Sequence, residues 1–133
     1  MTPARVLEQV LEQWSDAAAS WDADALGACY SADAGLHGGR PGHSLGRSAI
    51  VAYFASYDAV IRSGVVQALD QEVSQPAEGL LVAQGHVRMS FVLGDGRETV
   101  SLLRSTLVLR VEEGVWRIWR HHFSPVPEAP PLG

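Results

Sequence analysis

Apolar residues recur at helical spacing near the start of the chain. Residues 2–21 open with Thr2-Pro3, an N-cap followed by proline at the first helical position. The apolar positions that follow return every three or four residues, which predicts an amphipathic helix. These positions are Leu7, Val10, Leu11, Trp14, Ala17, Ala18 and Trp21.

Two further helices are predicted in this half of the chain. Asp22 or Asp24 can cap a short helix over residues 25–30. Ser48 can cap a third helix over residues 49–62, which Gly64 would end. Between these two helices, residues 35–38 are consistent with a short strand and residues 38–43 with a turn-rich loop.

After Gly64 the apolar spacing changes to two, which is typical of strands. Strands are predicted over residues 65–75, 80–93, 97–112 and 115–124, with turns at 76–79, 94–96 and 113–114. Helices followed by strands indicate an α+β fold, with three N-terminal helices packed on a curved antiparallel sheet. The proline-rich residues 125–133 are predicted to form a flexible tail.

Composition limits the possible partners. The 133 residues indicate one domain, residues 1–133, and 47 % of them are apolar, enough for a core. The net charge is −5 and the basic residues are scattered, which argues against nucleic acid or an anionic membrane as the main partner. No apolar run could span a membrane and no signal peptide is evident, so we expect a cytoplasmic protein.

Several kinds of chemistry are excluded or disfavoured. The chain has no lysine, which excludes a Schiff base, and its single Cys29 is expected to be a buried structural thiol. His121 and His122 are adjacent, so on a strand they diverge and cannot share a metal. Residues 38–42, GGRPG, lack the features of a phosphate-binding loop. We therefore expect no metal and no cofactor.

Three stretches of the chain resemble the NTF2-like, SnoaL-like superfamily. The helical half has Trp14, WDADALGACYSADA at 21–34 and GRSAI at 46–50. The segment RSTLVLRVEEGVWRIWRHHFS at 104–124 is similar to the ending of SgcJ/EcaC-type and calmodulin-kinase-association-type members. The resemblance implies a cone-shaped, cystatin-like α+β fold and a homodimer. It implies little about activity, because the fold hosts isomerases, cyclases, dehydratases, hydrolases and non-catalytic domains.

The turns predict which side chains share a face of the sheet. Two-residue turns at 113–114 and 95–96 would place polar strand residues on the helix-covered face; these are His86, Arg88, Ser90, Ser101, Ser105, Arg120 and His122. The opposite face would be apolar and would form the homodimer through Val87, Met89, Phe91, Val100 and Leu102. A three-residue turn or a β-bulge would shift the pairing by one and invert part of this assignment.

The resulting candidate site has His122 as acid or base, with Arg120 or Tyr57 polarising an oxygen. The candidate pocket-lining residues are Trp14, Tyr30, His37, Phe54, His86, Arg88, Ser105 and Trp116. His121 is expected at the surface or an interface. For His122 a structural hydrogen bond is an equal alternative. Arg104 is expected to form an ion pair with a nearby acid, and for Arg120 such a pair is an equal alternative to ligand binding.

Two functions fit these residues. The first is binding of a small apolar or amphipathic molecule in the cone, either by a binding protein or by a cofactor-free cyclase, isomerase or dehydratase. The second is a non-catalytic dimerisation or assembly module whose cone is filled by Trp14, Phe54, Tyr57 and Trp116. No strand carboxylate is expected to face the cavity, and Asp33 can be structural, so carboxylate-based isomerase chemistry is disfavoured.

Overall fold

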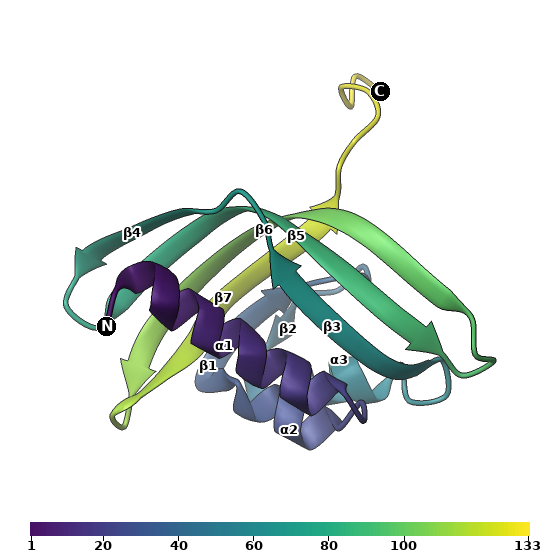
Figure 1. Cartoon of the computed structure of the whole chain (residues 1–133), viewed down its shortest axis with the longest axis horizontal. Coiled ribbons are helices and arrows are strands. Elements are labelled where there is room, and N and C mark those ends of the chain that lie inside the picture. Colours follow the sequence, from purple (N-terminus) through teal and green to yellow (C-terminus); the bar gives the residue numbers. More distant parts are fainter.

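The computed structural model describes residues 1–133 and contains three helices and seven strands. The helices lie beneath one face of a single arched sheet (Figure 1), which confirms the α+β prediction. The helices are α1 (Pro3–Ala18), α2 (Ala23–Ala28) and α3 (Arg47–Ala55). The strands are β1 (Tyr30–His37), β2 (Ser44–Leu45), β3 (Ile61–Ala68), β4 (Glu72–Ala77), β5 (Leu80–Leu93), β6 (Glu98–Glu112) and β7 (Val115–Pro125).

The sheet is open and mixed. Its order is β2-β1-β7-β6-β5-β3, and β4 pairs with β5 beside β3. All pairs are antiparallel except β1 with β7, which is parallel, so the prediction of a wholly antiparallel sheet needs this correction. The parallel pair is possible because α3 and the other strands separate β1 from β7 along the chain.

The helix ends follow local capping chemistry, with one exception. Thr2 Oγ1 accepts a hydrogen bond from the Arg5 amide, and Asp22 caps α2 through the Ala25 amide, as predicted. α3 instead starts after Gly46 and has no side-chain cap, so Ser48 is not its cap. It also ends at Ala55 rather than near residue 62, because the chain from Ile61 onward pairs with β5.

The predicted strand over residues 65–75 is two strands that share one edge of β5. β3 pairs with residues 87–93 of β5 and β4 pairs with residues 80–84. At the break, the Leu69 amide bonds the His86 carbonyl, and the carbonyl of Asp70 crosses directly over Gly85. A Cβ on Gly85 would lie 2.2 Å from that oxygen, so the crossing requires glycine.

The core contains a tight aromatic group where the helices meet the sheet. Trp14, Trp21 and Phe54 contact one another edge to face, with ring centroids 5.9–6.2 Å apart. Trp21 Nε1 donates to the carbonyl of Phe54 at 3.0 Å. This end of the cone is therefore filled by side chains.

The β5–β6 register differs from the prediction by one residue. Leu93 and Arg97 bond across the turn, so three residues rather than two separate the strands. Arg88 therefore pairs with Leu102, and His86 pairs with Arg104 instead of Ser105. The assignment of β6 itself was right, but every side chain of β5 takes the opposite face from the one expected.

A β-bulge in β7 makes a second correction. The two-residue turn at Glu113-Gly114 has positive φ at both positions and pairs Val111 with Trp116, as predicted. The register then shifts between the Leu109–Ile118 and Val108–Arg120 pairs, which leaves Trp119 without a partner. Beyond this bulge His121 takes the inner face and His122 the outer face.

These two shifts reverse much of the predicted face assignment. Val87 and Met89 are buried under the helices and Phe91 packs against the same core, so none of them can form a dimer surface. Of the predicted dimer residues only Val100 and Leu102 are exposed, at 66 % and 52 %. A homodimer through these two residues stays a prediction.

Candidate functional site

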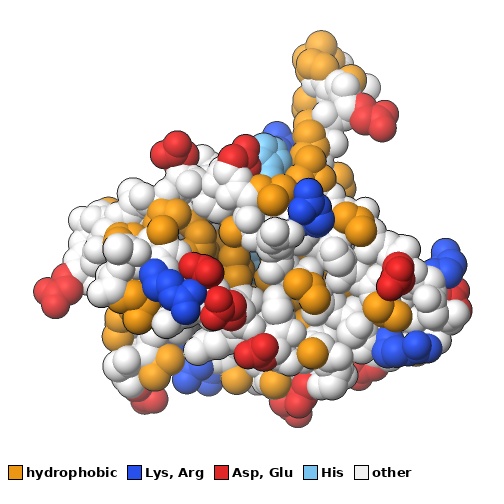
Figure 2. Space-filling view, in the orientation of Figure 1, with side chains coloured by type: hydrophobic (Ala, Val, Ile, Leu, Met, Phe, Trp, Pro, Cys, Tyr) orange, Lys and Arg blue, Asp and Glu red, His pale blue; other side chains and the backbone are white.

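A groove opens between α1 and the edge formed by β3 and β4. Its volume is about 660 Å³, within the range of small-molecule sites. Figure 2 shows a recess in this region of the surface, with apolar side chains at its floor and charged ones along its rim. We call it the α1 groove; its apolar lining includes Leu7, Leu11, Val66, Ala68, Leu69 and Val73, and Glu8, Glu12 and Asp16 also line it.

Gln71 is the uncharged amide side chain in the β3–β4 break that lines the α1 groove. Its Nε2 donates to the His86 carbonyl at 2.7 Å and to Ser105 Oγ at 3.4 Å. Its Oε1 is buried and has no hydrogen-bond partner in the chain. An unpaired buried acceptor of this kind costs about 1–3 kcal/mol, so a donor brought to it would be stabilised.

A hydrogen-bonded chain of three rings crosses the core near the sheet. Trp14 Nε1 donates to the Tyr30 hydroxyl at 3.3 Å, and that hydroxyl is 2.8 Å from His121 Nδ1. Burial, with a smaller contribution from His122, lowers the pKa of His121 to about 3. His121 is therefore neutral at physiological pH, and burial also raises the pKa of Tyr30.

The buried interior offers little acid–base chemistry. The buried polar or charged residues are Ser31, Ser105 and His121, so no carboxylate lies in the core. A base with a pKa near 3 is far from neutrality and accepts protons poorly. Cys29 is buried as predicted, and burial raises the pKa of its thiol to about 11, so little thiolate forms.

The predicted pocket-lining residues divide between the two faces of the sheet. Trp14, Tyr30, Phe54 and Ser105 are buried on the inner side and Trp116 packs partly against the core. The others lie on the outer face. His86 and Arg88 were reversed by the β5 register, and His37 is exposed at the end of β1, where it pairs with His122.

The three predicted catalytic residues do not converge. Tyr57 follows α3 and packs edge to face on Trp21 with centroids 6.4 Å apart, beneath the sheet. Arg120 and His122 are exposed on its outer face. Their predicted inward direction was wrong, because the bulge at Trp119 was not included in the pairing.

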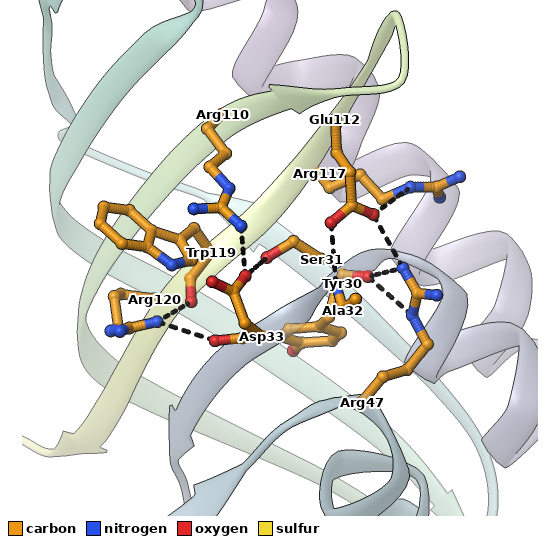
Figure 3. A network of polar contacts seen from close by, with 10 residues as sticks. All are labelled: Tyr30, Ser31, Ala32, Asp33, Arg47, Arg110, Glu112, Arg117, Trp119 and Arg120. Atoms are coloured by element: carbon orange, nitrogen blue, oxygen red, sulfur yellow. Dashed lines mark hydrogen bonds and ion pairs between the residues drawn. The ribbon is translucent and has the colours of Figure 1, made fainter.

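Polar contacts join β1 to β6 and β7 on the outer side (Figure 3). The carboxylate of Asp33 pairs with Arg110, and its carbonyl accepts from Arg120 Nη1 at 3.2 Å. Both arginines also lie over the Trp119 ring, 4.7 and 4.6 Å from its centroid. Asp33 thus has a structural role here.

Arg47 makes the second half of this network. Its guanidinium donates two hydrogen bonds to the Tyr30 carbonyl, at 3.0 and 2.7 Å, and pairs with Glu112 at 3.1 Å. Arg47 therefore fixes the start of β1, the strand that carries the Tyr30 hydroxyl into the core.

Sequence reasoning missed His121 and Gln71. For His121 a signal existed: it shares strand parity with Phe123, and one bulge after Ile118 aligns both with the apolar inner positions. For Gln71 no local signal existed, because the break between β3 and β4 depends on the crossing over Gly85.

Two further observations concern other kinds of site. No three His, Cys, Asp or Glu side chains gather closely enough to hold a metal ion. None of the helices combines the length and the apolar character needed to cross a bilayer.

Known structures share this fold over nearly the whole chain. A candidate calcium/calmodulin dependent protein kinase II association domain from Xanthomonas campestris is 22 % identical, with a TM-score of 0.84 over 97 % of this chain and 91 % of that one. A candidate scytalone dehydratase from Novosphingobium aromaticivorans is 15 % identical, with a TM-score of 0.74 over 98 % and 93 %. A ketosteroid isomerase-like protein from Erwinia carotovora atroseptica is 19 % identical, with a TM-score of 0.73 over 92 % and 95 %.

At these identities the structural neighbours establish the fold alone. A search of curated proteins finds no match. The sequence model of the SnoaL-like domain matches residues 7–128, which is most of the chain. The open mixed sheet, the three covering helices and this match together mean that the chain belongs to the SnoaL-like domain family.

Proposed function

We propose that the protein binds a small, mainly apolar molecule in the α1 groove, and that the molecule carries a hydroxyl or N–H donor. The single observation that carries this proposal is the unpaired Oε1 of Gln71, a residue of the groove lining. Apolar walls supply affinity through burial, and one well-placed polar group sets orientation. The groove is the feature that favours ligand binding over a purely structural module with a filled cone.

Binding is favoured over proton-transfer catalysis. The core holds no carboxylate, its one buried imidazole has a pKa of about 3, and the acids that line the groove, Glu8, Glu12 and Asp16, are exposed to solvent. Efficient acid or base catalysis at neutral pH needs a pKa much closer to 7. The neighbours described as a dehydratase and as isomerase-like support a ligand cavity in this fold, while the residues of this chain support holding a ligand rather than transforming it.

The test compares two probes of similar size, 1-naphthol and naphthalene, in titrations followed by probe fluorescence. The wild-type protein is expected to bind 1-naphthol more tightly, by about tenfold, because only the naphthol hydroxyl can donate to Gln71 Oε1. Gln71→Met keeps the side-chain length but removes the acceptor, and it should abolish the preference. Equal affinity of the two probes for the wild type, or a preference that survives Gln71→Met, would contradict the proposal.

A groove-filling variant provides the second arm. Val73→Trp places a large ring in the groove lining and should weaken binding of both probes, because the apolar volume is lost. The matched control is Val100→Trp, an exposed position on the opposite face of the sheet, which should leave both affinities unchanged. Unaltered binding in Val73→Trp would place the probes elsewhere.

A further inference from the structure

The outer face of the sheet carries a polar depression over the middle of β5, β6 and β7. Its volume is about 400 Å³, and none of its lining residues is hydrophobic. Six of the lining residues form what we call the outer basic patch: Gln84, His86, Arg104, Thr106, His122 and Ser124. The helices cover the other face of this sheet, and polar side chains on its solvated face follow the usual inside–outside alternation of antiparallel strands.

The strand register explains how these six side chains meet. Thr106 pairs with Gln84 on one side and His122 on the other, and Arg104 in the next row pairs with His86 and Ser124. Directly paired residues on one face have Cβ atoms about 5 Å apart. The patch is therefore two adjacent rows of three polar side chains, and the β7 bulge is what brings His122 and Ser124 into them.

Arg104 is the charged centre of the patch and is not neutralised. None of the seven ion pairs in the chain involves it, so the predicted ion pair of Arg104 with a nearby acid is wrong. The patch itself contains no acidic residue. The nearby Asp70 contacts His86 Nδ1 at 2.9 Å and is itself mostly exposed.

Two more arginines border the patch without acidic partners. Arg88, two residues from His86 on β5, bonds the neutral Gln67 side chain at 3.1 Å. Arg120, two residues from His122 on β7, bonds only backbone carbonyls. Three of the ten arginines of a chain with net charge −5 thus lie at or beside this patch without an acidic partner.

We propose that the outer basic patch binds a small anion bearing a carboxylate or phosphate group. Arg104 would bind it through its guanidinium fork, with Thr106, Ser124 and the ring of His122 as further hydrogen-bonding groups. The site lies on the side of the sheet opposite the helices and the core, so it does not depend on the ligand proposed for the α1 groove.

The experiment is a titration of the labelled protein at constant ionic strength, followed by amide chemical shifts. The probes are inorganic phosphate and succinate, with chloride as the reference anion. Saturable shifts confined to residues of β5, β6 and β7 are expected, and the stronger of the two probes identifies which anionic group is preferred. No saturable response to either probe would overturn the proposal.

Variants separate a specific site from general charge screening. Arg104→Gln should weaken binding by about tenfold, because it removes a charge-assisted contact. Arg97→Gln removes the same charge at the β5–β6 turn, away from the patch, and should leave affinity unchanged. Equal losses of affinity in both variants would mean that net charge alone attracts the anion. Dimerisation that depends on the anion, measured by sedimentation, would mean that the anion bridges two chains.

Discussion

The two faces of the β5–β6 pair have the same backbone but opposite chemistry. On the inner face, Val87, Met89 and Leu107 are buried under the helices. On the outer face, the neighbouring positions His86, Arg88 and Leu102 reach solvent or are partly exposed. Because successive residues of a strand alternate between faces, one residue along the chain separates a core position from a surface position.

The largest expected effect is the difference in stability between two variants that introduce a charge, one on the inner face and one on the outer face. Val87→Asp buries an unpaired carboxylate and should destabilise the protein by about 4 kcal/mol or more, enough to unfold many domains. Leu102→Asp, at an exposed position that pairs with the next residue of β5, should change stability by less than about 0.5 kcal/mol. Urea denaturation measures both, and similar losses would show that the two faces are not distinct.

The pH dependence of stability distinguishes the buried His121 from the adjacent, exposed His122. The folded-state pKa of His121 is about 3, below the ordinary value near 6.5, so between these values the unfolded chain binds one more proton than the folded chain. Stability should therefore fall as pH drops from about 6.5 towards 3, by up to about 1.4 kcal/mol per pH unit.

The two histidines supply their own matched variants. His121→Asn keeps a polar group near the Tyr30 hydroxyl and should remove this part of the pH dependence. His122→Asn changes the exposed neighbour on the outer face and should preserve it. Urea midpoints measured between pH 7 and pH 4 test this, and an unchanged slope in His121→Asn would contradict the assignment.

The smallest expected effects compare two polar contacts of β1. Tyr30→Phe leaves Trp14 Nε1 and His121 Nδ1 without their shared partner in the core and should cost about 2 kcal/mol. Asp33→Asn weakens an ion pair whose carboxylate side chain is 65 % exposed and should cost less than about 1 kcal/mol. Thermal unfolding of both variants measures the difference; a larger loss for Asp33→Asn would reverse the ranking of the two faces.

Most elements could be predicted from local pattern. The capped first helix, the Glu113-Gly114 turn and the period-two alternation of β6 depend on neighbouring residues alone, and they were right. The end of α3 was not, since Tyr57, Val60 and Ile61 continue the helical spacing, whereas the helix ends at Ala55 and Ile61 already pairs with β5. Tertiary pairing overrides propensity where the two compete.

The candidate site was predicted less well, for a related reason. His122 and Arg120 were assigned inward by counting alternation without a bulge, and His86 by counting from a turn one residue too short. Each error moved an entire strand segment to the other face. Gln71, now the central residue of the proposed ligand site, lies at a strand break that no local pattern predicts.

The sequence alone determined the family resemblance, the α+β class and which residues of β6 face the helices, because these depend on short-range periodicity and on motifs contiguous in the chain. Only the tertiary structure decided the face of β5 and of the end of β7, the groove beside α1 and the meeting of Arg104 with His86 and His122. The physical reason is that side-chain direction in a sheet depends on register, and a single extra residue in a turn or a bulge reverses it.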